Sequence, residues 1–156
     1  MGNKNYENTF SLTLQPHMLN LPLSWKAPRQ IFVNSMSDLF HEDIPLTYIQ
    51  QVVGVMQQAK QHTFQVLTKR SRRLRMLFPE ISWPDNVWMG ITVESYEVTN
   101  RIDDLRATGV KIKFLSCEPL LSSLGEINLT GIDWLIAGGE SGPQSRPMRK
   151  DWVIEL

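Results

Sequence analysis

Short apolar runs alternate with amphipathic stretches along the chain. Runs of four to seven mostly apolar residues, bounded by turn-forming residues, predict five β-strands at 30–33, 64–67, 87–93, 111–115 and 133–137. A helix is predicted over 45–60, because apolar residues recur there at steps of three and four: Leu46, Ile49, Val53 and Met56. Further helices are expected to begin near Ser71, Ser95 and Lys150, and residues 1–28 to form an extended or loop lead-in.

This alternation of strands and helices is typical of an α/β fold in which parallel strands are joined by crossover connections. We therefore expect a single domain over residues 1–156. The strand spacing resembles that of a parallel (β/α) barrel of the TIM-barrel type, but a complete barrel takes about 250 residues. The alternatives are a small open sheet and an incomplete barrel of about five strands. The second is favoured, because the amphipathic pattern continues up to Leu156.

Composition and charge exclude several classes of protein. Sixteen basic and sixteen acidic residues give a formal net charge of zero, so binding to nucleic acid or to a membrane surface would have to be local. No run of about 18 apolar residues is present, and no membrane span is expected. Cys117 is the only cysteine, which excludes an intrachain disulfide or a cysteine cluster and predicts a cytoplasmic protein.

Three of the predicted strands run into a glutamate: Glu94, Glu118 and Glu140. The intervals of 24 and 22 residues match one strand plus one helix with its loops, so the three carboxylates are expected at the same end of a parallel sheet. Neighbouring carboxylates repel one another, so at least one is expected to have a raised pKa or a bound cation. The alternative is that they cap helices or form ion pairs with Lys69 or Arg146.

Other polar residues and glycines also follow the predicted strands: Asn34, Ser35, Lys69, Gly138, Gly139 and Ser141. The segment Gly138–Gly142 predicts a turn with positive φ whose backbone amides approach a ligand, or else only a tight turn. Arg146 is expected either to clamp a carboxylate or phosphate, or to lie free on the surface. The acidic residues between Asp38 and Asp43 are explained by the helix that follows them, and no metal site is predicted.

One segment, 69–75, carries five basic residues in seven. Its candidates for nucleic-acid contact are Arg70, Arg72, Arg73 and Arg75, and the alternative is a solvated helix exterior. Cys117 is expected to be a buried small hydrophobic residue, because no histidine lies near it in sequence to activate a nucleophile.

Four segments are distinctive: RQIFVNSMSDLFHED (29–43), HTFQVLTKR (62–70), FLSCEPLL (114–121) and GGESGP (138–143). Together they closely resemble the phage and prophage family of three-cysteine-motif proteins, described as radical-SAM-like, over about Tyr6 to Trp152. The resemblance implies a (β/α) barrel that holds S-adenosylmethionine and a [4Fe–4S] cluster in full-length relatives. The cluster cysteines would precede Met1 and further strands would follow Trp152. We therefore expect an internal piece of such a protein, truncated at both ends and holding no cofactor alone.

Three functions follow as hypotheses. The first is a truncated radical-SAM-like protein, inactive alone, that keeps part of a substrate and cofactor rim. Its catalytic candidates are Glu94, Glu118, Glu140 and Lys69, and its cofactor-binding candidates are Asn34, Ser35, Gly138, Gly139, Ser141 and Arg146. The second is a non-catalytic module that binds nucleic acid, a nucleotide or a protein partner through 69–75. The third is a hydrolase that uses the three glutamates. Self-association through exposed sheet edges is also expected.

Overall fold

The computed structural model describes residues 11–156. Five strands form one parallel sheet in which the spatial order follows the sequence: β1 (Gln30–Val33), β2 (Thr63–Thr68), β3 (Val87–Thr92), β4 (Ile112–Cys117) and β5 (Trp134–Ala137). All five lie where the apolar runs predict them, and the α/β class is confirmed. β4 extends two residues beyond its predicted end, so Ser116 and Cys117 belong to the strand.

The helices follow the strands in the expected order: α1 (Leu46–Gln58), α2 (Ser71–Leu77), α3 (Arg101–Arg106) and α4 (Lys150–Ile154). The helix predicted from Ser95 is instead a 3₁₀ turn, η5 (Tyr96–Val98), and α3 begins only at Arg101. A further 3₁₀ turn, η4 (Phe78–Glu80), ends α2. The predicted lead-in contains two 3₁₀ turns, η2 (Pro16–Met18) and η3 (Leu21–Ser24), and its residues 1–10 lie outside the described part.

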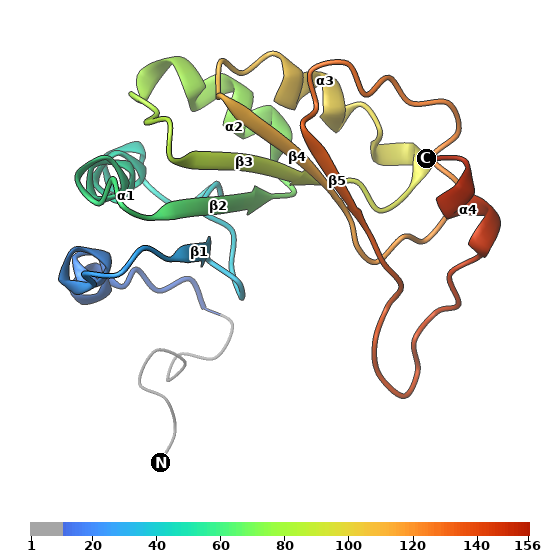
Figure 1. Cartoon of the computed structure of the whole chain (residues 1–156), viewed down its shortest axis with the longest axis horizontal. Helices are drawn as coiled ribbons and strands as arrows, with labels where there is room; N and C mark the ends of the chain where they lie inside the picture. Colours follow the sequence, from blue (N-terminus) through green and yellow to red (C-terminus); the bar gives the residue numbers. More distant parts are fainter. Residues whose placement is uncertain (1–10) are drawn as a thin grey trace.

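The hydrophobic core lies between the helices and one face of the sheet. Figure 1 shows α1, α2 and α3 along the outer side of the curved sheet. Five of their core side chains are at most 2% exposed: Ile49, Val53 and Met56 of α1, Leu74 of α2 and Leu105 of α3. They pack in one cluster with strand residues that include Val66, Met89 and Ile91. This burial explains the three-and-four spacing of apolar residues in the helical segments.

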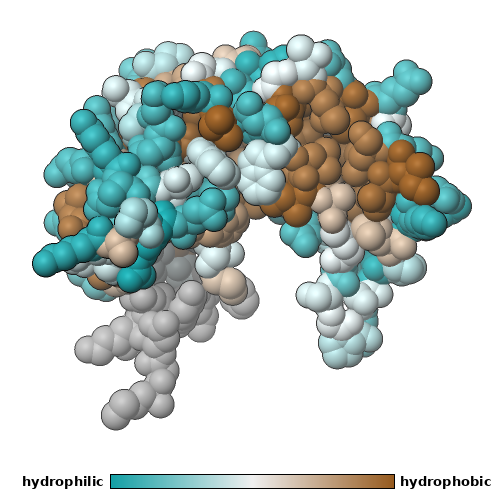
Figure 2. All heavy atoms as spheres, viewed as in Figure 1, coloured by the Kyte–Doolittle hydropathy of each residue, from teal (hydrophilic) through white to brown (hydrophobic). Residues whose placement is uncertain are grey.

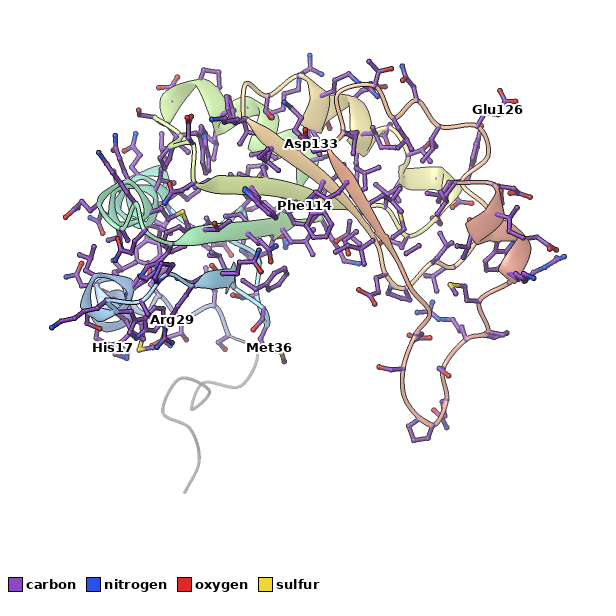
Figure 3. The ribbon with its side chains drawn as sticks, viewed as in Figure 1. His17, Arg29, Met36, Phe114, Glu126 and Asp133 are labelled. Atoms are coloured by element: carbon purple, nitrogen blue, oxygen red, sulfur yellow. The ribbon has the colours of Figure 1, made fainter. Side chains whose placement is uncertain are left out.

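The other face of the sheet is concave and rich in aromatic side chains. The strand register places Phe32, Gln65 and Trp88 side by side on this face, and Phe32 is 46% exposed. Further along the sheet, the Phe114 ring stacks on Trp134 with centroids 4.8 Å apart (Figure 3). Figure 2 shows apolar residues gathered over the part of the molecule that contains β4 and β5. Parallel sheets are usually covered on both faces, so the partial exposure of this face is unusual.

Both edge strands have one free side. β1 pairs only with β2, and β5 only with β4, within residues 11–156. The strands therefore form an open parallel sheet in this part of the chain. No helix in residues 11–156 is both long and apolar enough to cross a membrane.

Candidate functional site

The five parallel strands all end at one edge of the sheet, which we call the carboxyl edge. Polar residues end or follow each strand there: Asn34 after β1, Thr68 and Lys69 at β2, Thr92 and Glu94 at β3, Ser116 and Glu118 at β4, and Glu140 after β5. Thr68, Thr92 and Ser116 are buried last or near-last residues of their strands, whereas the glutamates lie beyond the strand ends. In parallel α/β folds, ligand sites lie at this edge.

Glu94 is clamped by two cations from different elements. Nζ of Lys69, just after β2, lies 3.1 Å from Oε1, and Nη1 of Arg101, the first residue of α3, lies 2.9 Å from Oε2. Burial acts to raise the pKa of Glu94, but the hydrogen bond from Lys69 and the charges of Arg101 and Lys69 outweigh it and hold the pKa below its usual value. Glu94 is therefore ionised at neutral pH and ties β3 to β2 and α3.

Glu140 is paired with Arg146 within the loop after β5. Nε and Nη2 of Arg146 each donate to a carboxylate oxygen at 2.8 Å, and the backbone N–H of Arg146 donates at 2.9 Å. These hydrogen bonds lower the pKa of Glu140 to about 2. The ion pairs with Lys69 and Arg146 that were the alternative for these glutamates are therefore found, and Glu94 and Glu140 have lowered pKa values because each has a cation of its own. Of the two roles considered for Arg146, clamping a carboxylate is found, and the carboxylate is Glu140.

Glu118 differs from the other two glutamates. It is exposed, and no ion pair or hydrogen bond from residues 11–156 reaches its carboxylate. Its side chain lies over Gly138, where an added Cβ would be 2.5 Å from Oε1. Strand alternation places that Cβ on the same face as Trp134 and Ile136, so the Glu118 carboxylate lies over the concave face at the carboxyl edge. Gly138, which has no side chain, leaves the space that the Glu118 side chain occupies.

The loop that follows β5 has a different backbone from the one predicted. Gly138 and Gly139 do not have positive φ, and in this loop only Gly142 does, with φ of 114°. Gly139 instead packs beside Met148, since an added Cβ would lie 3.4 Å from the Met148 Cβ. Ser141 is exposed. The predicted positive φ is therefore found in this segment at Gly142 and not at Gly138 or Gly139, and the approach of its backbone amides to a ligand stays a prediction.

After β1, the chain turns sharply through a residue in the left-handed region. Asn34 has φ of 58°, and its Nδ2 donates to the Ser37 hydroxyl at 2.8 Å. Ser35 beside it is exposed. The two candidates from this strand therefore lie at the carboxyl edge, with the Asn34 side chain used to hold the turn.

Asp38 is a polar residue whose role the sequence did not reveal. Its carboxylate accepts hydrogen bonds from the Thr68 hydroxyl at 2.8 Å, from the Lys69 backbone N–H at 3.1 Å and from Arg70 at 3.2 Å. The Asp38 side chain is 15% exposed. It therefore fastens the loop after β1 to the loop after β2. The partners lie 30 or more residues away, so local pattern could only suggest a role at the start of the next helix.

The basic segment 69–75 divides into structural and available cations. Arg70 binds Glu42 at 2.9 Å, and Arg73 donates to the carbonyls of Glu42 and Ile44 at 2.6 and 2.7 Å. Both arginines thus hold the loop before α1 against α2. Arg75 reaches Asp104 at 3.3 Å and is 60% exposed. Arg72 is exposed and has no hydrogen-bond or ion-pair partner within residues 11–156.

Cys117 is buried, as predicted. Burial, together with the charge of Glu94, raises the pKa of its thiol to about 11. The thiol therefore stays protonated at neutral pH, which does not suit a nucleophile or a metal ligand. Residues 11–156 contain no group of three or more His, Cys, Asp or Glu side chains placed to hold a metal ion.

The chain matches a family described as "Protein of unknown function (DUF5131)" over residues 1–156. The chain belongs to this family. The match includes the whole sheet and every residue of the carboxyl edge of this DUF5131 protein. Comparisons with curated proteins and with solved structures give no match. The family description assigns no activity, so a function has to be argued from the site.

Proposed function

We propose that this DUF5131 chain forms part of a radical-SAM-like (β/α) barrel and that its carboxyl edge binds a small ligand with a cationic group, S-adenosylmethionine being the candidate. The observation that carries the proposal is the state of the three glutamates. Glu94 and Glu140 are neutralised by the protein's own cations, whereas the Glu118 carboxylate over the concave face has no ion pair with any residue of 11–156. A carboxylate at the carboxyl edge with no partner in the described residues is suited to a cation from a ligand.

The barrel part of the proposal is supported by the sheet. Its strands are parallel and follow one another in sequence order, as in (β/α) barrels, and three helices pack on the outer side (Figure 1). The concave face carries the large side chains Trp88, Phe114 and Trp134, and within residues 11–156 both edge strands have a free side. In a barrel, further strands would pair with these edges and their side chains would fill the concave side. Self-association through the same edges stays a prediction, which sedimentation at several concentrations can check.

The resemblance implies a [4Fe–4S] cluster and S-adenosylmethionine, and the residues of this chain suit only the second. A [4Fe–4S] cluster needs several thiolates, and this chain has one cysteine, which is buried with its pKa raised to about 11. The residues of this chain do not fit a cluster, and no step is assigned to one. S-adenosylmethionine fits better, because Glu118 can pair with one of its cationic groups. When bound, it would supply an alkyl group activated by a positively charged sulfur.

The roles assigned to the other residues are those of binding and positioning. The clamp of Lys69 and Arg101 on Glu94 fixes the end of β3, and Asp38 fixes the loops after β1 and β2. Gly138 leaves space for the Glu118 side chain. Because Glu94 and Glu140 have lowered pKa values, neither suits the general acid of a two-carboxylate hydrolase. The hydrolase hypothesis is therefore not favoured.

Isothermal titration calorimetry with S-adenosylmethionine tests the proposal. Glu118→Gln keeps the shape of the side chain and removes its charge, and we expect it to weaken binding about tenfold or more, as for the loss of a charge-assisted hydrogen bond. Glu126→Gln is the matched control, because Glu126 is also exposed and lies on the loop between β4 and β5, away from the carboxyl edge (Figure 3). The proposal is wrong if the wild-type chain does not bind the ligand or if Glu118→Gln binds it as tightly as wild type.

A further inference from the structure

A second feature of the molecule is independent of Glu118. A cleft of about 940 Å³ lies where the first residues of α2 and α3 come together. Six cationic side chains line it: Lys69, Arg70, Arg72, Arg73, Arg75 and Arg101. Only two acidic residues, Glu42 and Asp104, line it as well. The whole chain has no net charge, so this cleft is a local concentration of positive charge.

The existing contacts show which of these cations a ligand could engage. Arg70 and Arg73 hold the loop before α1, and Lys69 and Arg101 hold Glu94. Arg72 has no partner within residues 11–156, and Arg75, which is 60% exposed, has one partner there, Asp104, at 3.3 Å. Arg72 and Arg75 are three residues apart on α2, so their side chains lie on the same side of the helix. They are therefore two available cations on one wall of the cleft.

The lining also indicates the class of ligand. The side chains around the cleft are charged or polar apart from Met76, and none is aromatic. A nucleotide or a single strand is normally held by stacking of its bases on aromatic rings, which this cleft does not offer. A ligand recognised through phosphates alone fits better, because guanidinium groups pair with phosphate oxygens in two-pronged hydrogen bonds. Duplex nucleic acid presents such phosphates in continuous rows and needs no stacking.

We propose that the cleft between α2 and α3 binds the phosphate backbone of duplex nucleic acid, with Arg72 and Arg75 as the contacting residues. Binding is expected to be independent of base sequence and to weaken steeply as salt is added, because each neutralised phosphate releases condensed counterions. Lys69 and Arg101 add positive potential at the end of the cleft while they keep their ion pairs with Glu94.

Fluorescence anisotropy of a labelled DNA duplex, of about one to two helical turns, measures this binding across a salt series. We expect the double variant Arg72→Gln and Arg75→Gln to weaken binding at low salt about tenfold or more. Two lost phosphate contacts should reduce the slope of log affinity against log salt by about 1.8, at roughly 0.9 per contact. The matched control is Lys60→Gln with Lys111→Gln, which removes the same charge from two exposed lysines away from the cleft, Lys60 with no ion pair among residues 11–156 and Lys111 paired with Asp85.

Three results would overturn the inference. The first is the absence of duplex binding by the wild-type chain at low salt, and the second is an equal loss of affinity in the control variant. The third is displacement of the duplex by inorganic tripolyphosphate as readily as by unlabelled duplex at equal phosphate concentration, which would make the cleft a site for small polyphosphates. Glu118→Gln should leave the anisotropy titration unchanged, so failure of this inference can be told apart from failure of the proposed function. Circular dichroism of each variant checks that it is folded.

Discussion

The ring of Phe114 in β4 occupies the place that a side chain on Gly90 in β3 would take. The two residues are directly opposite in the parallel register. A Cβ added to Gly90 would lie closer than 3.0 Å to three atoms of the ring. Phe114 is 1% exposed and stacks on Trp134, so the ring has little freedom to move away. One missing side chain therefore sets how the aromatic residues pack on the concave face.

Replacement of Gly90 by alanine tests this packing. We expect Gly90→Ala to lower the free energy of unfolding by about 1–3 kcal/mol, because the added methyl group overlaps the ring. Gly54→Ala is the control, since Gly54 lies inside α1 with nothing within 4 Å of an added Cβ, and it should stabilise the protein by about 0.5–1 kcal/mol. Chemical denaturation measures both. Equal stability of Gly90→Ala and wild type would show that the ring is not held where the structure places it.

A second test concerns the hydrogen bonds by which Asp38 joins the loop after β1 to the loop after β2. Asp38→Asn removes the charge that Arg70 pairs with and one of the acceptors used by Thr68 and Lys69. We expect a loss of about 1–3 kcal/mol in unfolding free energy, as for a largely buried, charge-assisted network. Asp43→Asn is the control, because the Asp43 side chain is 77% exposed, and it should change stability by less than about 0.5 kcal/mol. If Asp38→Asn and Asp43→Asn have the same unfolding free energy, Asp38 does not hold these two loops together.

The Glu94 clamp predicts a dependence of stability on pH. The pKa of Glu94 is lowered in the folded state, so its contribution is fully present above the unfolded pKa of about 4.3 and is lost as the pH falls through the folded value. We therefore expect Glu94→Gln to be less stable than wild type at pH 7, by about 1–2 kcal/mol, and the difference to shrink below pH 4. Denaturant melts between pH 3 and 7 measure it. A difference that stayed constant with pH would contradict the clamp.

The buried position of Cys117 predicts low reactivity. Its thiol has a pKa of about 11 and lies at the end of β4, inside the core. A thiol reagent at pH 7.5 should therefore label Cys117 in the native protein no faster than local unfolding exposes the thiol. In denaturant it should label Cys117 rapidly. Labelling of the folded protein at the rate of free cysteine would place Cys117 at the surface instead.

Local pattern was sufficient for the architecture. The apolar runs at 30–33 and 133–137 are strands in the structure, and the three-and-four spacing from Leu46 to Met56 is the buried face of α1. Burial of one face of a helix, or of one or both faces of a strand, places apolar residues at regular intervals, and this periodicity can be recognised in the sequence. The order of strands then follows from parallel pairing through crossovers.

Partner choice could be predicted only in part: ion pairs of the glutamates with Lys69 or Arg146 were one of the alternatives, but which glutamate each would bind, and the role of Asp38, were not predicted. Lys69 pairs with Glu94, Arg146 with Glu140, and Asp38 with Thr68, and the first and last of these pairs span 25 and 30 residues. Such contacts depend on where loops meet at the carboxyl edge, and spacing along the chain does not determine this. The interruption between η5 and α3 and the closeness of Gly90 to Phe114 are tertiary effects of the same kind.

The most direct test of the proposed carboxyl-edge site is an amide NMR titration of the labelled protein with S-adenosylmethionine. We expect chemical shifts to change most at the ends of β4 and β5, for Glu118, Gly138 and their neighbours, and we expect these changes to disappear in Glu118→Gln. The amide of Asp133 reports on the opposite edge of the sheet, where β5 begins, and should not shift (Figure 3). Shifts centred on Asp133, or none at Glu118 and Gly138 at saturating ligand, would contradict the proposed site.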